Sequence, residues 1–347
     1  MTHPPLPPSE YILSIEESRR IFEEQIRPSL TGVARERPTV VFVAGQPGAG
    51  KTSLQSAFLA RLGNDEAVAL DSDDLLAYHP RYLLFSLLAD RAAATLCEHD
   101  ATRWREMAVD HVRHERLDVV YCNPFGRAGW AGDRMLDFRD AGYRVEIAFV
   151  AVHEAQSLLG MVDRYESQRA TNGFGRWVDP KAHDFIYSGV LRTADRADAE
   201  RLADAVYVVR RGGHITYSNQ LVDGEWAHPP RTRSAIETER SRAWTDPERD
   251  HFRHRWNLTA SRAADDLWPL LRDIAARAPA APSARLAEGS LREQLGLLSH
   301  SVSDLAAIIA QSGPATTARP LDSQPDEVID RGPEHGYGDP NDERELE

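Results

Sequence analysis

A glycine-rich stretch near the start of the chain matches the pattern G-x-x-x-x-G-K-[ST] in full. Its glycines let successive backbone N–H groups point at one phosphate without Cβ clashes, and a helix that follows directs its free N–H groups to the same anion. Lys51 reaches the β- and γ-phosphates of a nucleotide, and the Thr52 hydroxyl is placed to ligate Mg²⁺. The predicted nucleotide-binding residues are Gly45, Gln46, Pro47, Gly48, Ala49, Gly50, Lys51, Thr52 and Ser53. Lys51 stands out because Lys181 is the only other lysine among 41 basic residues.

A short segment with three carboxylates, Asp71-Ser72-Asp73-Asp74, follows the next apolar run of the chain. In small-molecule kinases of this kind, a carboxylate at such a strand end faces the terminal phosphate and accepts the proton of an attacking hydroxyl. We assign this role of catalytic base to Asp73. The alternative is a helix N-cap in a solvated acidic turn, because Asp and Ser are also preferred there. The phosphate motif alone fits an ATPase, a GTPase or a kinase, but neither lysine lies in a guanine-reading N-K-x-D.

Short apolar runs rich in β-branched residues predict the strands that carry these groups. They lie at residues 39–44, 66–70, 117–121, 144–152 and 205–209. Segments with helical spacing separate them, among them residues 10–30, 53–62 and 81–117. This alternation predicts an α/β fold, with a doubly wound, mainly parallel sheet and helices on both faces. A glycine turn after the fifth strand predicts an antiparallel hairpin at the edge of the sheet.

The composition along the chain predicts four regions. A proline-rich N-terminus, residues 1–9, is expected to be disordered, and residues 10–230 are expected to form the nucleotide-binding domain. We expect a helical C-terminal extension over residues 231–310 and a disordered acidic tail over residues 311–347. Within the extension, residues 278–284 resemble a linker. Apolar residues at helical spacing between 286 and 309 predict a helix packed on the domain or, alternatively, a self-association helix.

The charge and the remaining composition exclude several classes of protein. The net charge of the 347 residues is −13, and residues 321–347 contribute ten acidic side chains against two arginines. A general nucleic-acid binder needs an excess of cations, so we expect no nucleic-acid partner. No run approaches the length of a membrane span, and the N-terminus lacks the basic and apolar regions of a secretory signal. Two cysteines cannot form a disulfide framework, so a cytoplasmic protein is expected.

Four motifs in order along the chain resemble the zeta-toxin family of P-loop kinases. They read GQPGAGKTSLQSAF, DSDDLLAYHP, RYESQ and GFGRWVDPKAHDFIY, and the resemblance covers about residues 10–220. Members of this family belong to epsilon/zeta toxin–antitoxin systems and phosphorylate UDP-N-acetylglucosamine. The resemblance therefore implies a P-loop kinase-like fold, ATP and Mg²⁺, a nucleotide-sugar substrate, and a small helical antitoxin that blocks the ATP site.

The resemblance also implies roles for individual residues. Asp73 stands where the family has its general base for the sugar 3′-hydroxyl, and His79 matches a family histidine, which would place it at the substrate. Arg164 and Arg176 match two arginines that contact the ATP phosphates and the transferred group, and arginine forks stabilise such charge bidentately. Arg169 lies close by as a weaker candidate. His183 and Asp184 match a family pair that is expected to pack or cap a helix.

One departure from the family pattern concerns the acceptor side of the site. The family follows its third strand with an E-G-T segment whose glutamate contacts the sugar, and Cys122 occupies that position here. A neutral thiol cannot accept hydrogen bonds from a sugar as a carboxylate does. Glu106 lies at the spacing of another substrate-site glutamate of the family, and Asn123 could supply part of the missing contact. Glu106 and Asn123 are therefore the predicted substrate-binding residues beside Asp73 and His79.

Three functions remain as alternatives at this stage. The first is an ATP- and Mg²⁺-dependent kinase that phosphorylates UDP-N-acetylglucosamine and acts as a toxin. The second is a related phosphotransferase that modifies an antibiotic or another metabolite, which the missing glutamate favours. The third is a nucleotide-binding regulatory module with weak turnover, for which a base and two phosphate-directed arginines would not be needed.

Overall fold

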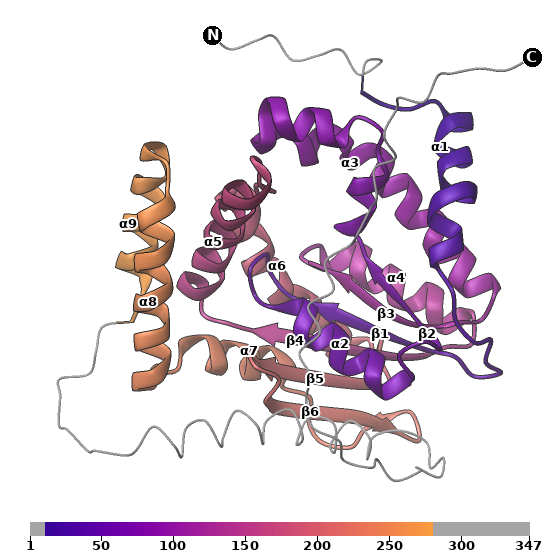
Figure 1. The fold of residues 1–347 in the computed structure, drawn as a ribbon. Helices are drawn as coiled ribbons and strands as arrows, with labels where there is room; N and C mark the ends of the chain where they lie inside the picture. Colours follow the sequence, from indigo (N-terminus) through magenta and orange to yellow (C-terminus); the bar gives the residue numbers. More distant parts are fainter. Residues whose placement is uncertain (1–10, 280–347) are drawn as a thin grey trace, which may run out of the picture. The chain divides into compact units, whose positions relative to one another are not determined.

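Seven strands form one sheet in the order β2-β3-β1-β4-β5-β6-β7 (Figure 1). The computed structural model describes residues 11–279. The strands are β1 (Thr39–Ala44), β2 (Ala67–Asp71), β3 (Asp118–Asn123), β4 (Arg144–Ala151), β5 (Ala205–Arg210), β6 (Ile215–Val222) and β7 (Glu225–Trp226). The strands β2, β3, β1, β4 and β5 are parallel to one another, β6 pairs antiparallel with β5, and β7 pairs antiparallel with β6. The predicted α/β class, the mainly parallel sheet and the antiparallel edge are confirmed.

Helices cover both faces of the sheet, because the central strands alternate apolar residues toward each side. On one face, Val40 and Phe42 of β1 join a large core with the helices α1, α3, α4 and α6. On the other face, Val41 and Val43 pack beneath α2. The helices are α1 (Ile15–Ile21), α2 (Lys51–Leu62), α3 (Tyr82–His114), α4 (Ala128–Asp140), α5 (Glu154–Asn172), α6 (Pro180–Ala199), α7 (Thr232–Ser241), α8 (Asp246–Arg262) and α9 (Trp268–Arg277).

The N-terminal helical segment is less regular than its apolar spacing predicts. The α-helix α1 ends at Ile21 and continues as a π-helical turn, Phe22–Ile26, and a 3₁₀ turn, Arg27–Ser29. Pro28 lies within this 3₁₀ turn, and proline lacks the N–H that a continuing α-helix would use for its backbone hydrogen bonds. The long helix α3 is likewise interrupted at Ala89, whose backbone is non-helical.

The helices after the sheet pack in two places. Ile236 of α7 belongs to the large core on the sheet, whereas Leu271 and Ile274 of α9 pack with α5 in a separate apolar cluster. Residues 231–277 are thus helical, as predicted. The predicted disordered ends and the apolar repeat between residues 286 and 309 lie outside the described residues. Within residues 11–279, no helix is long and apolar enough to cross a membrane.

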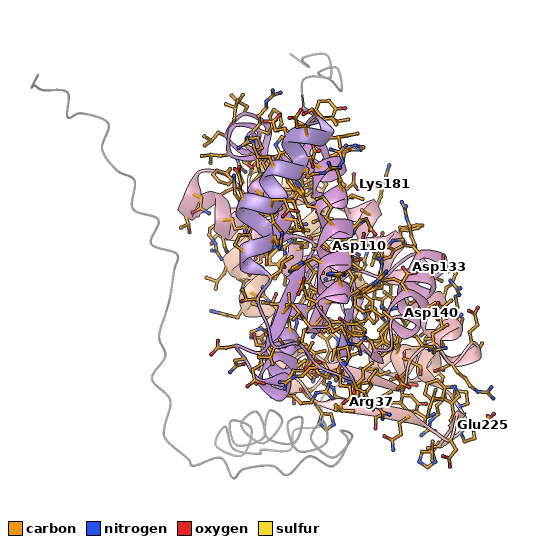
Figure 2. All side chains as sticks on the ribbon, turned by 90° about the vertical axis from the view of Figure 1, so that its right-hand side faces the viewer. Arg37, Asp110, Asp133, Asp140, Lys181 and Glu225 are labelled. Atoms are coloured by element: carbon orange, nitrogen blue, oxygen red, sulfur yellow. The ribbon has the colours of Figure 1, made fainter. Side chains whose placement is uncertain are left out.

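Several charged side chains lie at the surface of the helices, whereas both thiols lie in the interior. Asp110, Asp133 and Lys181 lie at the surface of the helices that cover the sheet (Figure 2). Both cysteines of the chain, Cys97 on α3 and Cys122 on β3, are fully buried.

Candidate active site

The glycine-rich loop connects β1 to α2 at the carboxyl edge of the parallel strands, which is where α/β proteins bind their ligands. Gly48 and Gly50 have φ angles of +75° and +97°, a region that side-chain-bearing residues rarely adopt. Lys51 is the first residue of α2, and its Nζ donates a hydrogen bond to the Gly45 carbonyl at 3.1 Å. The loop and the helix N-terminus therefore have the geometry that a phosphate cradle requires.

We expect Gly48→Ala to abolish nucleotide binding and to lower the melting temperature. A Cβ at this position would collide with the Ser157 carbonyl and lie 2.8 Å from the Met161 nitrogen, both on α5. Neither backbone group can move without shifting the helix, and the positive φ adds strain. Gly129→Ala on α4 is the matched control, because a Cβ there meets nothing within 4 Å. Thermal unfolding with and without ATP measures both effects. Wild-type nucleotide binding by Gly48→Ala would contradict this account of the loop.

The carboxylate turn after β2 presents Asp73 to an arginine fork. The Asp71 side chain accepts a hydrogen bond from the Asp73 N–H at 2.9 Å, which fixes the turn. Asp73 Oδ1 lies 2.5 Å from Arg176 Nη2, and a second ion-pair contact joins Oδ2 to Nη1. Burial acts to raise the pKa of Asp73, but Arg176, with Lys51 and Arg164, outweighs it and holds the pKa below its usual value. Asp73 is therefore ionised at neutral pH, as a proton acceptor must be.

The four predicted catalytic residues meet at this turn from separate elements. Lys51 comes from α2, Arg164 from α5, Arg176 from the loop between α5 and α6, and Asp73 from the turn after β2. Burial lowers the pKa of Lys51, which Asp73 partly offsets, and burial and the charge of Arg176 lower that of Arg164. Arg164 Nε is buried and has no hydrogen-bond partner among residues 11–279. Three cations thus converge on one base, an arrangement that suits the spread negative charge of phosphoryl transfer.

The loop that carries Arg176 is fastened to α5. The Arg176 N–H donates to Gln168 Oε1 at 2.8 Å, and Gly175 packs so closely on the Tyr165 carbonyl that a side chain there would collide with it. The Gly175 N–H also points to Asp90 Oδ2 at 3.4 Å. These contacts explain why a glycine precedes the arginine in the motif. They fix the direction in which the guanidinium leaves the loop.

Asp74 makes the turn sensitive to pH. Loss of surrounding water, together with the charges of Asp71 and Asp73, raises the pKa of Asp74 to about 6 from an ordinary value of 3.8. The folded state holds this proton more tightly than the unfolded chain does. Asp74 therefore lowers the free energy of unfolding little at low pH and lowers it increasingly as the pH rises through about 6.

We therefore expect Asp74→Asn to raise the melting temperature more at pH 8 than at pH 5. Thermal unfolding of the variant and of the unchanged protein at both pH values measures this difference. The same gain at the two pH values would show that Asp74 does not carry the proton in question.

Two predicted residues do not join the cluster. His79 was expected at the substrate, but its side chain is fully buried, Nε2 lies 2.9 Å from the Tyr11 carbonyl and Nδ1 accepts from the Arg81 N–H at 3.2 Å. With both ring nitrogens occupied, the imidazole joins the backbone at Tyr11 to the turn that contains Arg81. Arg169, the weaker arginine candidate, is held by Asp90 at 3.3 Å and Glu166 at 3.4 Å.

The acceptor side differs from the side that handles phosphates. The Cys122 side chain belongs to the apolar cluster beneath α2, and burial raises the pKa of its thiol. Asn123, the next residue along β3, donates to Ser72 Oγ at 2.8 Å and accepts from the Phe125 N–H at 3.3 Å, so it ties the carboxylate turn to β3. Glu106 on α3 is half exposed and paired with Arg134 and Arg105.

Sequence reasoning missed two groups that shape the site. Asp71 was read only as part of an acidic run, although its spacing of two residues from Asp73 suits a side chain that caps its own turn. Arg211 contacts the glycine-rich loop from the turn after β5. Nothing in the sequence separates Arg211 from the many other arginines.

Comparison with known proteins accounts for this arrangement. Residues 25–221, more than half of the chain, match the family model described as Zeta toxin. The chain belongs to the zeta-toxin family. The match contains the glycine-rich loop, the carboxylate turn and both arginines of the site, so the resemblance seen in the four motifs is confirmed.

Individual members of the zeta-toxin family show how distant the relationship is. Toxin zeta of Streptococcus agalactiae is 25% identical over 207 residues, which cover 57% of this chain and 71% of that protein. Toxin PezT of Streptococcus pneumoniae is 21% identical over 209 residues, covering 55% of this chain and 81% of that protein. A solved structure from the PezAT toxin–antitoxin system of Streptococcus pneumoniae superposes with a TM-score of 0.62 at 17% identity, over 72% of this chain and 99% of that one. The P-loop kinase-like fold is therefore shared.

Proposed function

We propose that this chain is an ATP-dependent phosphotransferase that moves the γ-phosphate of ATP to a hydroxyl of a small acceptor, first of all the 3′-hydroxyl of UDP-N-acetylglucosamine. The observation that carries the proposal is the convergence of Lys51, Arg164 and Arg176 on the ionised Asp73 beside the phosphate cradle. A protein that only binds nucleotide needs no such base, which weakens the regulatory alternative.

The proposed reaction uses each of these groups. Asp73 accepts the proton of the acceptor hydroxyl while the hydroxyl oxygen forms a bond to the γ-phosphorus. The bond between that phosphorus and the oxygen that bridges the β- and γ-phosphates breaks, and ADP leaves. Lys51, Arg164 and Arg176 stabilise the charge on the transferred group and on the departing ADP. The Thr52 hydroxyl, in the first turn of α2, suits a Mg²⁺ site whose other ligands are phosphates and water, and the ion would neutralise phosphate charge there.

The biological role is proposed from the family. The curated relatives are named toxins, and the solved structure with the shared fold comes from a toxin–antitoxin system. We infer that this chain is a toxin held inactive by a small helical antitoxin. ATP and nucleotide sugars would place its reaction in the cytoplasm, where a phosphorylated sugar nucleotide would deprive cell-wall synthesis of its precursor.

A second candidate keeps the reaction but changes the acceptor. The thiol of Cys122 lies in an apolar cluster and cannot replace a sugar-binding carboxylate, and the Glu106 carboxylate is already paired with two arginines. These observations favour a different alcohol, such as an antibiotic or another metabolite, as the acceptor.

Mass spectrometry of reaction products separates these candidates. The protein and its Asp73→Asn variant are incubated with ATP, Mg²⁺ and a panel of nucleotide sugars and aminoglycoside- or chloramphenicol-type alcohols. A phosphate gained by UDP-N-acetylglucosamine only with the unchanged protein supports the first candidate. Transfer only to another alcohol supports the second, and transfer to none of the panel would count against both.

A further inference from the structure

Two arginines approach the outer side of the glycine-rich loop, away from the four catalytic residues. Arg211, in the turn after β5, donates from Nη2 to the Gly48 carbonyl and from Nε to the Ala49 carbonyl at 3.4 Å. Arg240, on α7, donates from Nη2 to Gln46 Oε1 at 3.1 Å. Each guanidinium therefore contacts a different part of the same loop.

The loop also rests on α5 at this side. Gly160 of α5 leaves room for the Gly48 carbonyl, which a Cβ on Gly160 would approach to 2.8 Å, and the same Cβ would lie 3.1 Å from Arg211 Nη2. The Gly48 carbonyl is thus enclosed between α5 and the Arg211 fork. Because carbonyl and N–H point in opposite directions across a trans peptide, holding the Gly48 and Ala49 carbonyls outward directs the following N–H groups toward the cradle.

Arg240 is built into the interior of the fold. It is 4% exposed, donates from Nη1 to the Tyr187 carbonyl at 2.7 Å, and its guanidinium lies 3.8 Å from the centre of the Tyr187 ring. Its partner Gln46 is completely buried, and Gln46 Nε2 donates to the Val152 carbonyl at 3.1 Å and to Ser157 Oγ at 3.2 Å. The second residue of the loop is thereby fixed from three directions.

Neither arginine forms an ion pair with a carboxylate in the part of the chain that the structure describes. Burial lowers the pKa of both to about 10, which leaves them charged at neutral pH. A charge removed from water without a counter-ion is costly, and an anion in the cradle would offset part of that cost. The two arginines therefore favour the binding of phosphate in two ways: they hold the loop in position, and their positive charges attract the anion.

We propose that Arg211 and Arg240 are positioning residues that hold the glycine-rich loop in its phosphate-binding shape. Arg240 lies beyond residues 25–221, the part that matches the family, so α7 is on this view a component of the nucleotide site. The inference rests on the proposed function in that it takes ATP as the ligand.

The test measures ATP affinity of the full chain by calorimetry at 15 °C, where circular dichroism verifies that each variant is folded. Arg211→Met and Arg240→Met keep the length of the side chain and remove the charge and the fork. We expect each to weaken ATP binding by about tenfold or more, because a charge-assisted contact contributes roughly this factor. Inorganic tripolyphosphate should lose affinity in parallel, since the defect lies in phosphate binding. Arg233→Met, at an exposed position of α7 that pairs with Asp195 and Glu237, should bind as the unchanged protein does.

A merely structural role would lower the melting temperature without changing the affinity of the folded protein. Unchanged affinity in either folded variant, with binding by the parent protein intact, would overturn the inference and leave the proposed function standing. Failure of the parent protein itself to bind ATP would overturn the proposed function and this inference with it.

Discussion

Asp73→Asn is expected to bind ATP about as well as the unchanged protein and to transfer phosphate about 10²–10⁴-fold more slowly, the usual contribution of a general base. The amide has nearly the same shape as the carboxylate, so the variant loses the proton acceptor and the negative charge that pairs with Arg176 but keeps the shape of the turn. Since the Arg176 fork holds the pKa of Asp73 below its ordinary value, the rate of the unchanged protein should not fall through protonation of this group between pH 5 and 8. Single-turnover transfer and calorimetric ATP binding measure the two effects separately.

Asp110→Asn is the matched control for this change, because it makes the same substitution at a side chain that is 73% exposed on α3 (Figure 2). It should leave both ATP binding and transfer unaltered. Transfer by Asp73→Asn at the rate of the unchanged protein would mean that another group removes the proton.

Lys51→Met should lose both functions at once. The Lys51 ammonium is the only side-chain cation in the first turn of α2, and it donates a hydrogen bond to the Gly45 carbonyl at the start of the loop. Methionine can occupy the same partly buried space, so the fold should survive. The positive charge that would face the β- and γ-phosphates is lost. We expect transfer to fall by at least about 10²–10³-fold, together with weaker ATP binding. The same calorimetric and single-turnover measurements apply.

The chain supplies its own control for that lysine. Lys181, the other lysine, lies exposed near the start of α6 (Figure 2), and Lys181→Met should change neither measurement. Equal turnover by Lys51→Met and Lys181→Met would remove the loop lysine from the mechanism.

The phosphate side of the site could be predicted from sequence because its parts are local. The loop of β1 and α2, the turn at Asp73 and the motif of Arg176 each lie within a short segment, and parallel strands bring their carboxyl ends to one edge. The family resemblance then singled out Arg164 and Arg176, which no spacing rule would have separated from other arginines.

The acceptor side depended on contacts that no local pattern contains. The buried His79 ring is held by Tyr11, 68 positions away, whose carbonyl accepts a hydrogen bond from Nε2. The orientation of Cys122 could have been anticipated, since Val120 and Cys122 share one face of β3 by the alternation of a strand, and that face lies beneath α2. Arg240 could not, because its contact with Gln46 spans 194 positions.

The burial of both thiols also decides how the protein responds to oxidants. Only the thiolate reacts readily with peroxides, disulfides or alkylating agents. Burial raises the pKa of Cys97 to about 12 and raises that of Cys122 as well, although Cys122 sits beside the catalytic turn. Neither sulfur is therefore available as a redox sensor in the folded protein. In the folded protein, oxidants should therefore leave these two thiols, and the site beside Cys122, unmodified.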